Sequence, residues 1–247
     1  MTKGHLRILA YHRILPQVGD QTLAISTTAF VNQITYLKQK KYRFMTLAEY
    51  AKVHLQGKAP RKGNIAILTF DDGYADNYMY AYPILKQQGI TATFFITTGL
   101  IGSAKPYYWD LKNATEFSAA DYPMTAEQLC DLQTNGMEIA SHTVHHYELS
   151  KLTAADMTYE LAQSKKDLEE ILKQKVTSIC YPRGAYSSTV LKVAQDVGYS
   201  VGVITPRGKL PYTLLGLSRI GLYGHDTPFT TWLKLSGVYS ILRSMRA

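Results

Sequence analysis

The sequence predicts an α/β fold, a (β/α)7-type barrel in a single domain. Two observations support it: short apolar runs alternate with longer amphipathic stretches, and polar residues gather where the apolar runs end. Nearly continuous apolar runs are typical of parallel strands covered by helices. The length of 247 residues and the hydrophobic content of 46% suffice for one large core.

Seven apolar runs are the expected strands. In chain order they are residues 6–12, 65–71, 91–97, 137–143, 178–182, 199–205 and 217–223. No linker rich in Pro, Gly or Ser divides the chain, and no internal repeat is present. We therefore expect one catalytic domain over residues 1–247, in which residues 226–247 form a helical tail.

Helix signals occupy the segments between these runs. Thr46, Thr125 and Thr153 each precede an acidic or amide side chain by three residues, the arrangement of a capping box. Residues 153–175 place apolar side chains at helical spacing between charges, which predicts a surface helix. Gly89 lies where a helix is expected to end and a strand to begin.

Polar residues interrupt the expected strands mostly at their C-terminal ends. They are His12, Asp71, Asp72, His142 and Arg183, with His225 just beyond the last strand. In a parallel barrel these ends meet at one mouth, where active sites lie. The asymmetry therefore predicts an enzyme with its site at this mouth.

Composition limits the partners and the location of the protein. A formal charge of +8 and a pI near 9.3 favour anionic partners. The basic residues are dispersed and no nucleic-acid motif accompanies them, so we expect no nucleic-acid partner and, at most, peripheral contact with an anionic membrane. The N-terminal stretch does not resemble a signal peptide, so we expect a cytoplasmic protein that contacts the inner membrane face. A periplasmic or extracellular location is the alternative if a signal was removed.

Two adjacent carboxylates follow the second expected strand in TFDDGY, residues 69–74. Consecutive residues of an extended backbone point to opposite sides, so one of Asp71 and Asp72 can bind an ion while the other faces a substrate. Gly73 lets the chain turn away at once. A magnesium or phosphoryl-transfer site uses similar carboxylates. A purely structural role, with Asp72 as a helix cap and Asp71 in an ion pair, is the other alternative.

Three histidines, His142, His145 and His146, cluster at the end of the fourth expected strand. A carboxylate and two imidazoles form a ligand set for catalytic Zn²⁺ or a similar divalent ion, with one position open for water. Magnesium prefers oxygen ligands, so the histidines argue against it. A helix cap or a partly buried hydrogen-bond network is the alternative for such a cluster.

TFDDG followed by SHTVHH resembles the polysaccharide deacetylases (carbohydrate esterase family four, the NodB homology domain), metal-dependent N-deacetylases of N-acetylhexosamine polymers and conjugates. The resemblance covers about residues 5–225 and implies a distorted barrel of roughly seven βα units. It implies that Asp71 is the catalytic base and that Asp72, His142 and His146 bind the metal. That metal is expected to be Zn²⁺, with Co²⁺, Ni²⁺ or Mn²⁺ as alternatives.

The third family motif is only partly present. Residues 180–187, CYPRGAYS, resemble its variant with Tyr-Pro and a following Gly, but the family arginine would fall on Cys180. The resemblance assigns an oxyanion-donating backbone N–H to Arg183, whose side chain could also reach an anionic group of the substrate. An arginine on the last expected strand needs a carboxylate partner. We therefore expect Arg219 to hold Asp71 ionised, and an ion pair elsewhere is the alternative.

The family's general acid normally lies in a C-terminal Leu-His-like motif, which this chain lacks in its usual form. Residues 9–15, LAYHRIL, place His12 at the end of the first strand. This resembles the subgroup that deacetylates poly-N-acetylglucosamine, in which the motif lies near the N-terminus. The first and last strands of a closed barrel are neighbours, so either end of the chain can fill the same place. His225 is the alternative acid, and His145 is expected to be unconstrained.

The remaining candidates are expected to bind substrate along a groove: Tyr74, Trp109, Tyr181, Pro182, Arg183, Gly184 and Tyr186. Packing of its loop onto the barrel is the alternative for Trp109. The sequence therefore predicts a metal-dependent N-deacetylase that hydrolyses the acetamide of N-acetylhexosamine units in a polysaccharide or lipid-linked glycan. The alternatives are a non-catalytic carbohydrate-binding module with a degenerate site and a metal-dependent hydrolase of a non-sugar amide.

Overall fold

A parallel sheet forms the centre of the molecule. The computed structural model describes residues 5–19, 23–57, 63–112, 116–205 and 213–236. The strand order is β10-β9-β8-β7-β6-β5-β1-β11, and β4 pairs with β5. The strands are β1 (Leu6–Tyr11), β4 (Tyr42–Phe44), β5 (Asn64–Phe70), β6 (Thr93–Ile96), β7 (Glu138–Ser141), β8 (Ser178–Cys180), β9 (Val201–Ile204), β10 (Leu217–Ser218) and β11 (Ile220–Gly221).

The two ends of this sheet meet at Arg219. β10 pairs with β9, and β11 pairs with β1, yet only Arg219 separates β10 from β11 in the chain. The segment 217–221 therefore bridges both edges and nearly closes the sheet into a barrel. All seven expected runs contribute strands, the last of them split in two. The predicted distorted (β/α)7-type barrel is confirmed.

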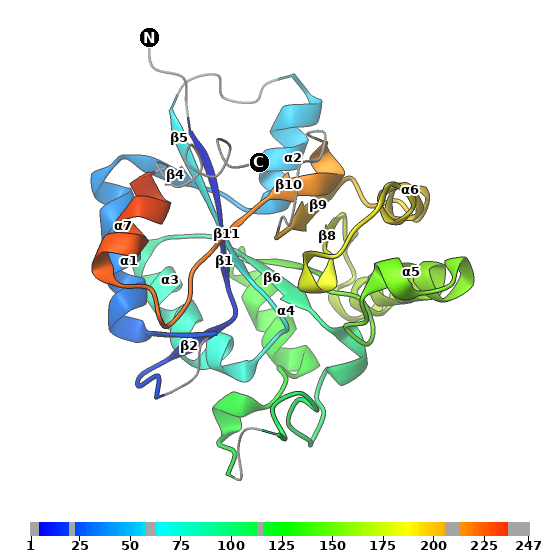
Figure 1. Cartoon of the computed structure of the whole chain (residues 1–247), viewed down its shortest axis with the longest axis horizontal. Coiled ribbons are helices and arrows are strands. Elements are labelled where there is room, and N and C mark those ends of the chain that lie inside the picture. The colour runs from blue at the N-terminus through cyan, green and yellow to red at the C-terminus, as the bar shows by residue number, and fades with distance from the viewer. Residues whose placement is uncertain (1–4, 20–22, 58–62, 113–115, 206–212, 237–247) are drawn as a thin grey trace.

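Helices surround the sheet (Figure 1). They are α1 (Thr27–Gln39), α2 (Leu47–Leu55), α3 (Tyr82–Gln88), α4 (Ala126–Thr134), α5 (Ala154–Leu172), α6 (Ser188–Asp196) and α7 (Pro228–Ser236). In Figure 1, α1 and α7 lie to the left of β1 and α5 and α6 to the right. The predicted caps are present: Thr46 and Thr125 form capping boxes, and the Thr153 side chain accepts the Asp156 N–H.

Shorter elements were not predicted. β2 (Arg13–Leu15) and β3 (Ala24–Ser26) form a separate parallel pair, and each is too short to show a periodic pattern. A π-helix, η1 (Asn77–Ala81), precedes α3. The 3-10 turns are η2 (Thr98–Leu100), η3 (Ala119–Asp121), η4 (Leu149–Lys151), η5 (Pro182–Gly184) and η6 (Leu214–Gly216).

Helix α2 covers the N-terminal end of the barrel. Its first backbone N–H groups donate to Thr93 Oγ1 and to the Glu138 carboxylate, which belong to the first residues of β6 and β7. Leu47 and Tyr50 of α2 pack with Ile67 and other strand side chains in one buried cluster. Because α2 covers this end of the barrel, a site is expected at the opposite end, where the strands have their C-terminal residues.

Helix α7 forms the first part of the expected C-terminal tail. It spans Pro228–Ser236, and the rest of the tail, residues 237–247, lies outside the described residues. Lys234 of α7 is bonded to both carboxylate oxygens of Asp226, at 2.6 and 2.7 Å, which fastens the helix to the segment after β11. Among the residues that the structure describes, no helix has the length and apolar character needed to cross a membrane.

Candidate active site

Asp71 and Asp72 lie where β5 ends, and both are buried. The Asp71 N–H still donates to the Tyr11 carbonyl at the end of β1, whereas Asp72 and Gly73 take positive φ values of 75° and 92°. The chain therefore leaves the sheet between the two carboxylates. A Cβ on Gly73 would lie 3.2 Å from Ile96 Cδ1, so both the backbone angle and the space favour glycine here.

Arg219 forms a bidentate ion pair with Asp71. Its Nη1 and Nη2 each donate to one Asp71 carboxylate oxygen at 2.6 Å, and both side chains are buried. Burial alone would raise the pKa of Asp71, but the Arg219 guanidinium outweighs it and holds that pKa well below its ordinary value. Asp71 is therefore ionised at neutral pH, at the point where the barrel closes.

Asp72, His142 and His146 converge on one point. Asp72 Oδ1 lies 3.4 Å from His142 Nε2 and 3.4 Å from His146 Nε2. The three ligand atoms lie within 4.8 Å of one another. Within the described part of the chain, Asp72 Oδ1 is buried without a hydrogen-bond partner. A buried carboxylate oxygen facing two imidazole nitrogens fits a divalent cation such as Zn²⁺, and fits Mg²⁺ less well.

Neighbouring groups act on the two histidines in different ways. Burial lowers the pKa of His142, but Cys180 and the Asp72 and Asp71 carboxylates outweigh it and hold that pKa well above its ordinary value, so a cation would displace a proton from His142. His142 Nδ1 lies 2.8 Å from the Cys180 carbonyl oxygen, which can only accept, so Nδ1 carries the proton and Nε2 faces Asp72. Burial and the nearby His142 lower the pKa of His146 to about 4. The His146 imidazole is therefore neutral at neutral pH and can bind a cation.

A second group, Asp71, His142 and Cys180, also has the spacing of a metal site. Its members are engaged otherwise, because Asp71 is paired with Arg219. Burial raises the pKa of the Cys180 thiol, which disfavours the thiolate that a metal would need. The Cys180 sulfur instead lies 3.1 Å from Arg219 Nη2. Cys180 therefore packs beside the guanidinium that the position between β10 and β11 supplies.

Backbone strain is concentrated at this site. The non-glycine residues in the left-handed region include Asp72 (φ 75°), Thr143 (φ 67°), His146 (φ 60°) and Arg183 (φ 58°). Such a conformation costs about 1–2 kcal/mol per residue. Strained residues that cluster around polar side chains are typical of functional sites, where the surrounding structure holds them in place.

His12 lies beside Asp71, at the end of β1. Its Nε2 is 3.9 Å from Asp71 Oδ2, and 21% of its side chain is exposed. The His12 carbonyl accepts a hydrogen bond from Asn77 Nδ2 at 2.9 Å. His225, the alternative acid, is exposed and stacks on Tyr223. None of the contacts found among the described residues joins His225 to Asp71, so the geometry favours His12.

The segment after η2 packs against the metal-ligand group. The Trp109 ring lies 4.9 Å from the His146 ring, and Trp109 Nε1 donates to the Tyr74 hydroxyl at 2.7 Å. The Tyr74 hydroxyl in turn donates to Asp110 at 2.6 Å. Tyr107 donates to the Asp72 carbonyl at 3.1 Å. Trp109 therefore remains at the edge of the site, partly exposed, while its neighbours hold it there.

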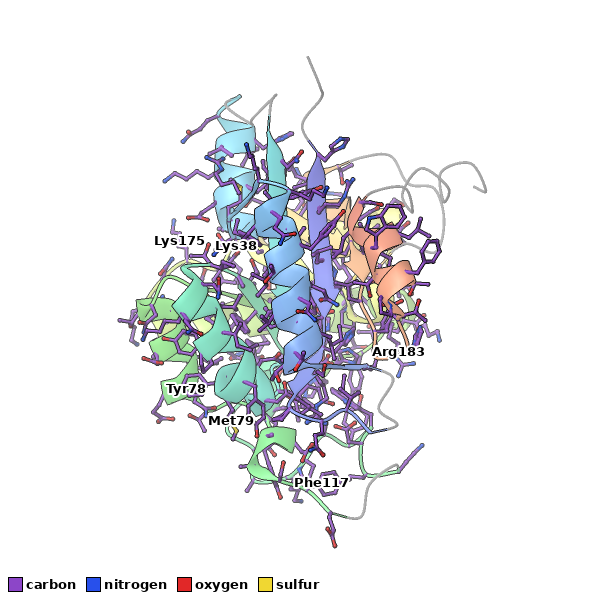
Figure 2. The ribbon with its side chains drawn as sticks, turned by 90° about the vertical axis from the view of Figure 1, so that its left-hand side faces the viewer. Lys38, Tyr78, Met79, Phe117, Lys175 and Arg183 are labelled. Atoms are coloured by element: carbon purple, nitrogen blue, oxygen red, sulfur yellow. The ribbon has the colours of Figure 1, made fainter. Side chains whose placement is uncertain are left out.

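Burial divides the expected groove residues into two sets. Arg183 is exposed, as its position in Figure 2 shows, and Trp109 and Tyr186 are partly exposed. The other members are buried: Tyr74, Tyr181, Pro182 and Gly184. Their burial does not support the expectation that these four line a substrate groove, which stays a prediction, because aromatic and turn residues next to a motif can also support it.

Three residues close to the site were not predicted. Arg13 pairs with Asp76 at 2.6 Å and so fastens the strand that follows His12. Asn77 donates a hydrogen bond to the His12 carbonyl. This role could not be told from the sequence, because an asparagine near the start of a helix is equally typical of a helix cap. Glu160 is buried on α5, and its signal was present in the sequence: it falls on the apolar face of a helix, where a charged residue needs a partner.

Fold and site together define a class, the NodB-type deacetylase domain. The family model described as "Polysaccharide deacetylase" matches residues 58–202. The chain belongs to the polysaccharide deacetylase family.

Individual relatives extend the match beyond the family region. YxkH of Bacillus subtilis is 34% identical over 203 residues, which are 82% of this chain and 65% of YxkH. The poly-β-1,6-N-acetyl-D-glucosamine N-deacetylase of Staphylococcus aureus is 29% identical over 185 residues, 72% of this chain and 60% of that protein. The chain thus spans 60–65% of the length of these curated relatives.

Solved structures agree with the barrel. The Streptococcus pyogenes deacetylase PplD, in complex with acetate, matches with a TM-score of 0.79 and 29% identity, and the match covers 95% of this chain and 99% of PplD. IcaB from Ammonifex degensii matches with a TM-score of 0.76 and 25% identity over 95% of this chain and 98% of IcaB.

Proposed function

We propose that this protein is a metal-dependent N-deacetylase that hydrolyses the acetamide of N-acetylhexosamine units and releases acetate. The observation that carries the proposal is the position of the buried Asp71–Arg219 pair beside the convergent Asp72, His142 and His146. An ionised carboxylate next to a three-ligand cation site is an arrangement suited to amide hydrolysis by an activated water.

Asp72, His142 and His146 would hold the cation, and Zn²⁺ matches one carboxylate and two imidazoles best, with Co²⁺, Ni²⁺ or Mn²⁺ as alternatives. When bound, such an ion polarises the acetamide carbonyl and lowers the pKa of its water towards about 7.

The protein's own residues move the protons. Asp71, held ionised and oriented by Arg219, accepts the proton of the attacking water. The backbone N–H of Arg183 donates to the oxyanion that forms at the acetyl carbonyl oxygen as water attacks the carbonyl carbon. His12, near Asp71 and partly exposed, gives a proton to the leaving amine.

The aromatic surface beside the site supports a sugar substrate. Trp109 packs on His146, Tyr108 contacts Trp109 edge-on and is 51% exposed, and Tyr147 follows His146 with 50% exposed. Such rings offer an apolar face to sugar rings and a polar edge to water. The name of the Staphylococcus aureus relative supports poly-N-acetylglucosamine as the first polymer to assay. Lipid-linked glycans are the second substrate class to assay. They fit the predicted cytoplasmic location and the predicted contact with an anionic membrane.

The arginine missing at position 180 was the ground for a non-catalytic alternative. Arg219 supplies a guanidinium to Asp71 from the position between β10 and β11, which supports an enzyme. The test is acetate release from N-acetylglucosamine oligomers by the purified protein, before and after chelation and after Zn²⁺ is added back. We expect activity that chelation removes and Zn²⁺ restores. Absence of acetate release from every N-acetylated glycan offered, lipid-linked ones included, would overturn the proposal.

A further inference from the structure

Helix α5 turns a polar face towards the loops of the candidate site. Glu160, Ser164 and Asp167 are spaced at i, i+4 and i+7, which places them along one face of a helix. Glu160 is 2% exposed and Ser164 is fully buried. A buried carboxylate is tolerated only when hydrogen bonds satisfy it. The partners of Glu160 therefore show what this face does.

Glu160 grips the segment between the two candidate histidine ligands. Its Oε2 accepts the backbone N–H groups of Val144 and His145, each at 2.9 Å. Its Oε1 accepts the Nδ1–H of His145 at 2.6 Å. These three donors lie between His142 and His146, next to the left-handed backbone of His146. The carboxylate thus holds the stretch of chain that sets the spacing of the two imidazoles.

Ser164 and Asp167 hold the two sides of the same loop. The Ser164 hydroxyl is 2.7 Å from the Ser141 hydroxyl, whose oxygen accepts the Thr143 N–H. Asp167 accepts the Thr98 hydroxyl at 2.9 Å, and the Thr98 N–H donates to the Thr143 carbonyl at 3.0 Å. Both chains of contacts end at Thr143, the other left-handed residue between the histidines.

We infer that Glu160, supported by Ser164 and Asp167, is a positioning residue that fixes the His142–His146 loop in a geometry ready for a metal ion. This inference rests on the proposed role of Asp72, His142 and His146. Glu160 contacts no candidate ligand side chain, and it acts through the backbone on both sides of His145. Groups that orient metal ligands in this way typically change metal affinity by about 10–100-fold when removed.

The test is a calorimetric titration of metal-free protein with Zn²⁺, with thermal unfolding of the metal-free form measured in parallel. Glu160→Gln keeps the side-chain volume but removes the carboxylate charge, so the charge-assisted hydrogen bonds to the two backbone N–H groups weaken, and His145 Nδ1 must change from donor to acceptor. We expect Zn²⁺ affinity to fall about 10–100-fold, with cooperative unfolding retained. His145→Ala removes only one of the three donors and is expected to lose less affinity than Glu160→Gln.

The matched control lies on the same helix. Glu170 is exposed and pairs with Lys166 at 3.8 Å, so Glu170→Gln is expected to bind Zn²⁺ like the unaltered protein. Glu160→Gln binding Zn²⁺ as tightly as Glu170→Gln would overturn the inference, and so would a loss in His145→Ala equal to that in Glu160→Gln. If Glu160→Gln does not fold, Ser164→Ala decides: a several-fold weaker affinity supports the inference, and an unchanged affinity overturns it.

The same titration separates this inference from the proposed function. Failure of the unaltered protein to bind Zn²⁺, or unchanged binding in His142→Ala, would contradict the metal site itself. Zn²⁺ binding that requires His142 but not Glu160 would leave the proposed function standing and reject only the positioning role.

Discussion

Replacing Arg219 with methionine tests the buried pair that prepares Asp71. Methionine fills part of the volume of the arginine but leaves the Asp71 carboxylate, 3% exposed, without its two hydrogen bonds of 2.6 Å. Breaking a buried ion pair by removing one partner costs roughly 3–5 kcal/mol. For a domain of this size that corresponds to a fall in Tm of about 6–20 °C.

The loss of stability in Arg219→Met must depend on pH, and the direction of that dependence follows from the pKa of Asp71. In the unaltered protein this pKa is depressed, so the pair's stabilisation is present above the ordinary Asp value of about 4 and is lost as the pH falls through the lower folded value. In Arg219→Met the lowering effect of the guanidinium is gone, and burial, the largest cause that remains, raises the pKa of Asp71 against the smaller lowering effects of His142 and His12. The variant carboxylate then takes up a proton at low pH, which removes the cost of the unpaired charge.

The measurement is thermal unfolding at pH 7 and pH 4, followed by circular dichroism. We expect the difference in Tm between the two proteins to be large at pH 7 and clearly smaller at pH 4. The pH–rate profile should move in step, because the acidic limb of kcat/KM shifts to higher pH when the base is protonated more easily. An equal Tm difference at both pH values, or an unmoved acidic limb, would refute the reasoning.

Three further predictions concern other parts of the site. Asp71→Asn is expected to keep its metal content and to lose roughly 10²–10⁴-fold in kcat, measured by metal analysis and acetate release; loss of the metal would contradict the role given to Asp71. Asn77→Ala removes the hydrogen bond to the His12 carbonyl and should lower kcat roughly tenfold with KM unchanged, whereas an unchanged kcat would show that His12 needs no such support. Gly184→Ala would bring a Cβ into overlap with the Thr205 carbonyl oxygen at a φ of 65°. It should therefore destabilise the protein by about 1–3 kcal/mol in urea unfolding, and a neutral effect would show that this turn can move.

The barrel could be predicted because each buried parallel strand leaves a recognisable pattern in its own short stretch of sequence. A parallel strand buried on both faces needs a continuous apolar run, so strands such as β5 and β9 are visible in the sequence. Polar residues that end such runs, as Asp71 and His142 do, have few structural explanations. Arg219 could be paired with Asp71 for a related reason, because a buried guanidinium demands a carboxylate.

The partners of the supporting residues could not be predicted, because they lie elsewhere in the chain, even where the burial of a residue such as Glu160 left a signal in the sequence. Tyr74 and Tyr181 adjoin motifs, but a tyrosine suits a groove wall and a buried brace equally well, and only the packing shows that both are buried. Glu160 faces a loop that lies 15 and 16 residues earlier in the chain. β2 and β3 are three residues each, shorter than any periodic pattern can reveal.

The most direct test of the metal site is an anomalous-difference map, measured at the zinc absorption edge, from a crystal of the protein grown with Zn²⁺. We predict one strong peak in contact with Asp72 Oδ1 and the Nε2 atoms of His142 and His146. A peak among Asp71, His142 and Cys180, the second group with suitable spacing, would contradict the assignment, as would a peak away from both groups.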